Sequence, residues 1–176
     1  MDHRIFVLYG GLPGGQITDA ALGAYLETLS RQTGERLFAA DEADMPDDFP
    51  IVFAASGGTA AAFRRLYERC GAKRWIILNQ GEGNALSASM QMATFLRERG
   101  ADFRIIYGTA ELAAARLKPY LGIMRAARAL SGLRIGAIGA PSDWLIADDT
   151  DRAAISARFG VAFADIAIRE LEDAFQ

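Results

Sequence analysis

Residues that commonly build metal sites or activated nucleophiles are scarce in this sequence. Its 176 residues include one histidine, His3, and one cysteine, Cys70. A zinc site of histidine and cysteine ligands cannot be formed by this chain alone, and neither can a disulfide. A Ser–His–Asp or Cys–His arrangement would have to recruit His3, which lies two residues from the N-terminus. A complete active site must therefore use carboxylates, arginine, tyrosine, amides or backbone groups, or be completed by another piece of protein.

Two glycine-rich segments follow apolar runs and could present backbone N–H groups to a ligand. Segment 10–16 holds four glycines and ends in Gln16, but its spacing matches neither a P-loop nor a dinucleotide-binding fingerprint. Segment 56–59 runs Ser-Gly-Gly-Thr into an alanine-rich helical stretch, where Ser56, Thr59 and the helix dipole could bind an anion or a hydroxyl group. A flexible turn and a strand-to-helix turn with Thr59 as N-cap explain the same residues without a ligand.

A third polar segment, 79–84, supplies Asn79, Glu82 and Asn84 after another apolar run. These side chains form a hydrogen-bonding set suited to a polyol or sugar, although Glu82 alone cannot act as a paired acid and base. Helix capping and turn formation are the alternative roles for the same residues.

The fourth candidate segment, 139–148, contains Ser142, Asp143 and Trp144 in succession. A hydroxyl, a carboxylate and an indole ring are the groups with which proteins often hold a sugar ring. Alternatively, Asp143 caps a helix and Trp144 fills a domain interface.

Short apolar runs alternate with longer helical segments along the chain. Most of the runs lack period-two alternation and are rich in Ile and Val, which predicts strands buried on both faces. The predicted strands are 5–9, 51–55, 75–78, 103–107 and 134–138, with weaker candidates at 36–39 and 161–166, and the predicted helices are 18–33, 59–69, 85–99, 111–130 and 151–158. Strand–helix–strand order with short connections predicts a doubly wound, mainly parallel α/β sheet with helices on both faces, a Rossmann-like or flavodoxin-like three-layer fold. In such a sheet, ligands collect where these polar segments lie, at the carboxyl ends of the strands.

Composition and charge argue against two classes of binding partner, nucleic acids and membranes. The net charge is −3, and the arginines are spread along the chain without a basic run, which gives nucleic-acid binding little support. No apolar stretch is long enough to span a bilayer, and we expect a cytoplasmic protein without membrane association. We expect a first α/β domain over residues 1–131, and residues 132–176 to begin a second α/β domain that is incomplete in this chain.

Several of these segments resemble the N-terminal part of L-fucose/L-arabinose isomerase-like proteins. The resemblance is carried by FRIIYG at 103–108, GLRIGAIG at 132–139 and, most strongly, PSDWLIA at 141–147. It covers most of the chain from about residue 50 onward, including segment 56–59 less specifically.

The resemblance implies an aldose–ketose isomerase that works through an ene-diol, with Mn²⁺ or a similar divalent ion held by Glu, Asp and His. Those ligands lie in the domains that follow the matched segment. It further implies that this chain supplies a substrate-enclosing and assembly region without a metal or cofactor of its own. Segments 10–16 and 79–84 would reach the sugar site of a neighbouring subunit in a homo-oligomer.

Three alternatives remain open at the level of sequence. The chain could be a free-standing module that binds a sugar or small anion, a flavodoxin-like electron carrier, or a purely structural oligomerisation domain.

Overall fold

The computed structural model describes residues 2–10, 17–40, 49–142, 144, 146 and 150–175. They fall in two compact units, Met1–Leu121 and Gly122–Gln176. The division lies inside a long helix, α4. Gln16 and Asp143, two of the predicted site residues, lie outside the described residues.

Strands and helices alternate along most of the chain. In chain order the elements are β1 (Asp2–Leu8), α1 (Asp19–Thr33), β2 (Arg36–Ala40), β3 (Ile51–Ala54), α2 (Ala60–Cys70), β4 (Arg74–Asn79), α3 (Ala85–Glu98), β5 (Asp102–Tyr107), α4 (Ala110–Leu130), β6 (Arg134–Ile138), α5 (Arg152–Phe159), β7 (Ala162–Ile166) and α6 (Ile168–Ala174).

The first unit contains a five-stranded sheet in the order β2-β1-β3-β4-β5, and every pairing in it is parallel. Ile5 of β1 pairs with Ala39 on one side and with Ile51 on the other. The predicted doubly wound α/β fold is confirmed. The weaker strand candidate at 36–39 is confirmed as well, as the edge strand β2.

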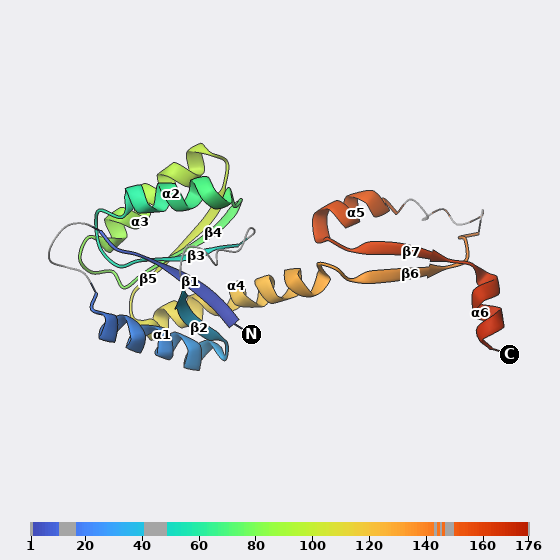
Figure 1. Cartoon of the computed structure of the whole chain (residues 1–176), viewed down its shortest axis with the longest axis horizontal. Helices are drawn as coiled ribbons and strands as arrows, with labels where there is room; N and C mark the ends of the chain where they lie inside the picture. The colour runs from blue at the N-terminus through green and yellow to red at the C-terminus, as the bar shows by residue number, and fades with distance from the viewer. Residues whose placement is uncertain are drawn as a thin grey trace. The chain divides into compact units, whose positions relative to one another are not determined.

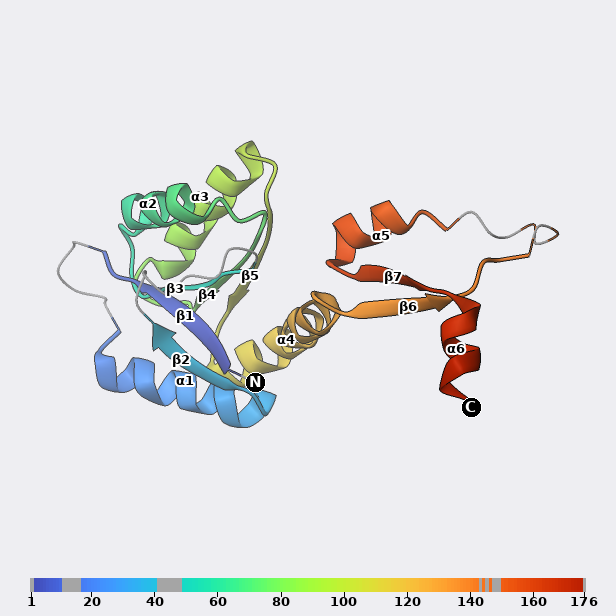
Figure 2. The same ribbon diagram turned by 45° about the vertical axis from the view of Figure 1, so that its right-hand side comes forward.

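Helices cover both faces of this sheet: α2 and α3 lie over one, α1 and the beginning of α4 over the other (Figures 1 and 2). Neighbouring residues of β3 therefore face different helices. Val52 belongs to a cluster with Phe63 of α2, whereas the ring of Phe53 packs edge-on against Tyr25 of α1, with ring centroids 5.4 Å apart. Covering both faces explains why the buried strands are continuously apolar instead of alternating.

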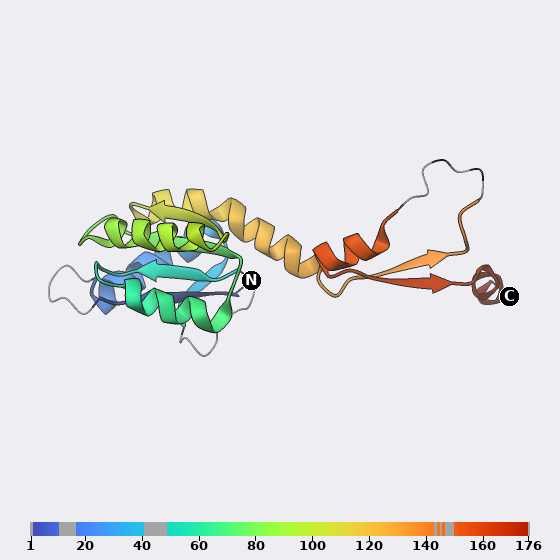
Figure 3. The same cartoon turned by 90° about the horizontal axis from the view of Figure 1, so that it is seen from above.

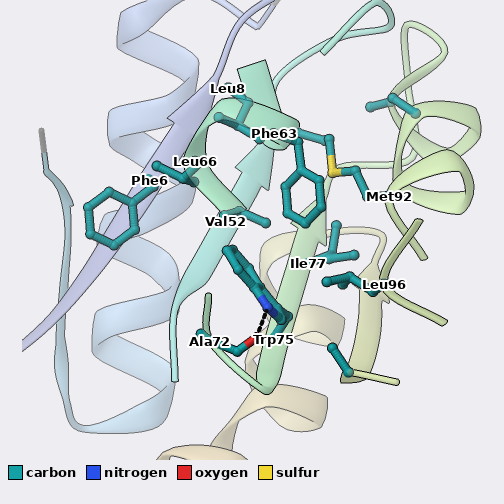
Figure 4. Close-up of a cluster of buried hydrophobic side chains, with 14 residues drawn as sticks. Phe6, Leu8, Val52, Phe63, Leu66, Ala72, Trp75, Ile77, Met92 and Leu96 are labelled. Atoms are coloured by element: carbon teal, nitrogen blue, oxygen red, sulfur yellow. Dashed lines mark hydrogen bonds between the residues drawn. The ribbon is translucent and has the colours of Figure 1, made fainter. Parts of the chain in front are cut away.

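Trp75 lies at the centre of the core between the sheet and helices α2 and α3 (Figure 4). Its ring meets that of Phe63 edge-on, with centroids 5.0 Å apart. The indole Nε1 donates to the carbonyl oxygen of Ala72 at 2.8 Å, which satisfies its polar group without water. A large aromatic side chain whose only donor is paired can be fully buried, and here it stabilises the packing of α2 and α3 on the sheet.

Helix α1 begins and ends with the local signals expected from its sequence. The Thr18 side chain accepts from the backbone N–H of Ala21 at 3.2 Å, and Gly34 ends the helix in the left-handed conformation with φ of 75°. These contacts fix the first and the last turn of α1.

The second unit is a β6–α5–β7 crossover whose two strands pair in parallel (Figure 3). Arg134 pairs with Ala162 at one end and Ile138 with Ile166 at the other. In β6, Ile135 is 40% and Ile138 50% exposed. Parallel strands are usually covered on both faces, and among the described residues this pair is not.

Candidate functional site

The order of the strands identifies where a ligand is expected. The chain goes from β1 outward to β2 and then crosses to β3 on the other side of β1, so the winding direction reverses between β1 and β3. In open parallel sheets, ligands bind outside the carboxyl ends of the strands at such a reversal. We call the residues at this place the loop edge: residues 9–10 after β1, 55–59 after β3 and 80–84 after β4.

Direct hydrogen bonds join the three parts of the loop edge. The backbone N–H of Gly10 donates to Ser56 Oγ at 2.9 Å, and the N–H of Gly57 donates to the carbonyl oxygen of Gly83 at 2.9 Å. Gly10 also comes very close to the next loop, because a Cβ built on it would lie 1.8 Å from the Gly57 oxygen. Only glycine fits there, and the loops are held in fixed positions.

The Ser56 hydroxyl is already used within this arrangement. Besides accepting from Gly10, its Oγ donates to the carbonyl oxygen of Gly57 at 3.1 Å, and the residue is buried. The structure therefore places Ser56 at the predicted edge, with its hydroxyl engaged in holding the loops together.

Asn79, the last residue of β4, is fully buried beneath the loop that follows it. Its Nδ2 donates to Ser89 Oγ at 2.8 Å, and its Oδ1 accepts from the Gly81 backbone at 2.9 Å. Ser89 in turn donates to the carbonyl oxygen of Ala85 at 2.9 Å. Asn79 thus shapes the loop by tying it to the first turn of α3.

Thr59, directly before α2, has unused hydrogen-bonding capacity. The residue is fully buried, and its hydroxyl has no partner among the described residues. Its backbone is helical, with φ of −87° and ψ of −2°, and its side chain makes no capping bond, contrary to the expected N-cap role. A capping residue normally has an extended backbone that turns its oxygen toward the first turn. A buried hydroxyl without a partner costs about 1–3 kcal/mol, which a ligand oxygen can recover.

Glu82 and Asn84 form the exposed rim of the loop edge. The carbonyl oxygen of Glu82 accepts from the backbone N–H of Ala85 at 2.9 Å, which closes a tight turn before α3. Asn84 has a left-handed backbone with φ of 59°, a conformation that asparagine tolerates, and its side chain makes no capping bond. Both side chains are sterically accessible to a polar ligand.

Two tyrosines near this edge were not predicted as functional residues. The Tyr25 hydroxyl of α1 donates to the carbonyl oxygen of Gly108, after β5, at 3.1 Å. Burial, and then the charge of Glu111, raises the pKa of Tyr25 to about 12. Tyr9 Oη donates to Asp19 Oδ1 at 3.3 Å, and burial followed by Asp19 raises the pKa of Tyr9 above its usual 10.0. Both tyrosines remain hydrogen-bond donors near neutral pH.

His3 lies at the amino end of β1, at the opposite end of that strand from the loop edge. It is buried, and its Nε2 is 3.8 Å from Glu35 Oε2. Within the described ranges, no three His, Cys, Asp or Glu side chains gather as a metal-binding group.

Ser142 and Trp144 follow β6 in the second unit, and both are exposed, Trp144 to 78%. The structure therefore brings together Ser56, Thr59, Asn79, Glu82 and Asn84 in the first unit, and describes Ser142 and Trp144 in the second.

No model of a protein family matches this chain, and no curated protein matches it. In the part of the chain that the structure describes, no helix combines the length and apolarity needed to cross a membrane.

Proposed function

We propose that the first unit binds a small sugar at the loop edge, as the substrate-enclosing and assembly region of a cytoplasmic, homo-oligomeric aldose–ketose isomerase of the kind the sequence resembles. The resemblance in sequence supports the isomerase part of this proposal. The position of the polar residues at the reversal between β1 and β3 supports the binding part.

One observation carries the binding proposal: the Thr59 hydroxyl is buried and has no partner among the described residues. Gly58 and Ala60, its neighbours in the chain, are both exposed. The N–H groups of the first turn of α2 add donors there, and that turn holds no acidic side chain to occupy them.

The available groups fit a polyhydroxylated ligand. Thr59 can donate to or accept from a sugar hydroxyl, and the N–H groups at the start of α2 can donate to a second oxygen. The exposed carboxylate of Glu82 and amide of Asn84 can pair with further hydroxyls at the rim. A small anion would also accept from the N–H groups. It has no donor for the Glu82 carboxylate, whereas a sugar hydroxyl has one.

The resemblance implies a divalent ion such as Mn²⁺, and the described residues do not offer a ligand set for it. No step through a metal is therefore derived for this chain. The proposal assigns ion binding and proton transfer to the isomerase parts that follow the matched segment. It predicts that this chain forms no ketose from L-fucose or L-arabinose in the presence of Mn²⁺, and turnover would overturn it.

Binding is tested by titrating the chain with L-fucose, L-arabinose and inorganic phosphate while recording nitrogen–proton correlation spectra. We expect the sugars to shift the amide signals of Gly57, Gly58 and Ala60. The substitution Thr59→Val removes one hydrogen bond to the ligand while the shape of the side chain stays nearly the same. We expect it to weaken sugar binding about two- to tenfold.

The matched control is Thr94→Val. Thr94 is exposed on α3, in a later turn of that helix than the one next to the loop edge, and its hydroxyl donates to the carbonyl oxygen of Met90 at 3.1 Å. Sugar binding unchanged in Thr59→Val, or weakened equally in both variants, contradicts the role given to Thr59. If phosphate shifts these signals and the sugars do not, the ligand of the loop edge is an anion and the sugar proposal is wrong.

A free-standing binding module is the second candidate. It is favoured because the hydrogen bonds that join the loop edge all lie within Met1–Leu121. Light scattering coupled to size-exclusion chromatography distinguishes the two: the isomerase region is expected as a defined oligomer, whereas micromolar sugar binding by a monomer identifies the module.

A further inference from the structure

A groove with a cavity volume of about 490 Å³ lies along α1 where that helix packs beside the edge strand β2. We call it the α1 groove. Its floor is apolar and is formed mainly by Leu22, Leu26, Leu37 and Phe38. The volume is within the range of small-molecule sites, which is about 300–1,000 Å³.

Three residues of α1 line this groove at intervals of four: Asp19, Gly23 and Glu27. Residues four apart follow one line along a helix. Gly23 interrupts that line, because a Cβ built on it would meet nothing within 4 Å. Glycine inside a helix costs about 0.5–1 kcal/mol relative to alanine, and here it leaves a notch between two carboxylates.

The charges along the groove all have the same sign. Asp19 and Glu27 lie eight residues apart on α1, a rise of about 12 Å, and none of the lining residues is lysine or arginine. Glu27 has no ion-pair partner in the described part of the chain. The groove therefore combines an apolar floor with negative ends.

We propose that the α1 groove binds a small organic cation, an ammonium group carried on an apolar body. The body occupies the space over Leu22 and Leu26 beside the Gly23 notch. The ammonium group donates to the carboxylate of Glu27 or Asp19, which are the charged residues that line the groove. A neutral molecule of the same shape gains only the apolar contact, and an anion meets repulsion from both carboxylates.

The test compares three probes with the same apolar body: phenylbutylamine, phenylbutanol and phenylbutyrate. Each is titrated into the chain while nitrogen–proton correlation spectra are recorded. We expect the amine to shift the amide signals of Gly23, Phe38 and Ala39 and to bind about two- to fivefold more tightly than the alcohol. We expect the carboxylate to bind least.

Two variants separate the apolar and the charged parts of the site. Gly23→Leu adds a side chain whose Cβ would meet nothing within 4 Å, and it is expected to weaken binding of the amine and of the alcohol more than tenfold. Glu27→Gln is expected to weaken the amine about two- to fivefold and to leave the alcohol unchanged. The controls are Ala21→Leu, on an exposed position of α1 outside the groove, and Glu172→Gln on α6.

Three outcomes overturn the proposal. The first is phenylbutyrate binding as tightly as phenylbutylamine. The second is unchanged amine binding in Gly23→Leu, which circular dichroism must show to be folded. The third is that none of the three probes binds; a change of molar mass in Gly23→Leu would then identify the groove as an interface between copies of the chain.

Discussion

Replacing Gly10 and Gly23 by alanine should change stability in opposite directions, although the chemical change is the same. At Gly10 the new Cβ would lie 1.8 Å from the Gly57 oxygen and 2.9 Å from Ser56 Oγ, so the loops after β1 and β3 must move apart. At Gly23 the new Cβ would meet nothing within 4 Å.

The size of each effect follows from these contacts. In Gly10→Ala the bond from the Gly10 N–H to Ser56 Oγ is lost, at about 0.5–1.5 kcal/mol, and the forced displacement adds about 1–3 kcal/mol. We expect the free energy of unfolding to fall by about 2–4 kcal/mol. In Gly23→Ala the gain in helix propensity raises it by about 0.4–1 kcal/mol. The loss of unfolded-chain entropy is similar in both variants, so their difference reports on the folded state.

The assay is equilibrium unfolding in urea followed by the fluorescence of Trp75, with Trp144 replaced by phenylalanine in every protein compared. Trp75 is buried in the core of the first unit, whereas Trp144 is 78% exposed. A Gly10→Ala variant that unfolds at the wild-type urea concentration or above it, with an unchanged m value, would refute the close approach of the two loops.

Three further predictions concern the first unit. Trp75→Phe leaves the buried carbonyl oxygen of Ala72 without its donor and should lower the free energy of unfolding by about 2–4 kcal/mol in urea denaturation; a loss well under 1 kcal/mol would argue against this contact. Because the folded pKa of Tyr25 is raised from 10.0 to about 12, its stabilising effect is complete below about pH 10 and is lost as the pH rises toward 12. Urea denaturation should therefore show about 1 kcal/mol more loss between about pH 9 and about pH 11 in the wild type than in Tyr25→Phe, and equal losses would contradict the assignment. Thr18→Ala removes the N-cap of α1 and should lower the thermal midpoint through a loss of about 1 kcal/mol, with no change expected if the cap is not formed.

The fold class was predictable because the buried strands are continuously apolar. Val52 and Phe53 face opposite helix layers, and both must be apolar for that reason. The short edge strand β2 gave a weaker signal, since its outer positions are not all buried. Helix α6 was not predicted: it has seven residues and begins after Ala167, and its N-terminal contact comes from Glu170, which accepts from the Ala167 N–H at 3.2 Å.

The location of the candidate site was predictable, but the use of each side chain was not. Polar residues after parallel strands must gather at one edge, and Ser56, Thr59 and Asn79 do. Whether a given hydroxyl is already hydrogen-bonded depends on contacts between loops that are far apart in the sequence. Ser56 is engaged by Gly10, 46 positions earlier in the chain, whereas Thr59 is not engaged among the described residues.

The α1 groove was missed for a different reason. Its signal, Asp19, Gly23 and Glu27 at intervals of four, was present in the sequence. A pattern of this kind on a helix also describes an ordinary solvated face. Only the neighbouring strand β2, which lines the other side through Leu37, Phe38 and Ala39, makes it a groove.

The hydrogen bonds that join the loop edge have a consequence for the order of folding. The bond from Gly10 to Ser56 closes a long stretch of chain, and it can form only after β1 and β3 have paired in register. Contacts of such long range are made late, after their loop-closure entropy has been overcome. Substitutions that break these bonds should therefore accelerate unfolding and leave the rate of folding nearly unchanged. The loop edge therefore cannot be complete before β1 and β3 have paired.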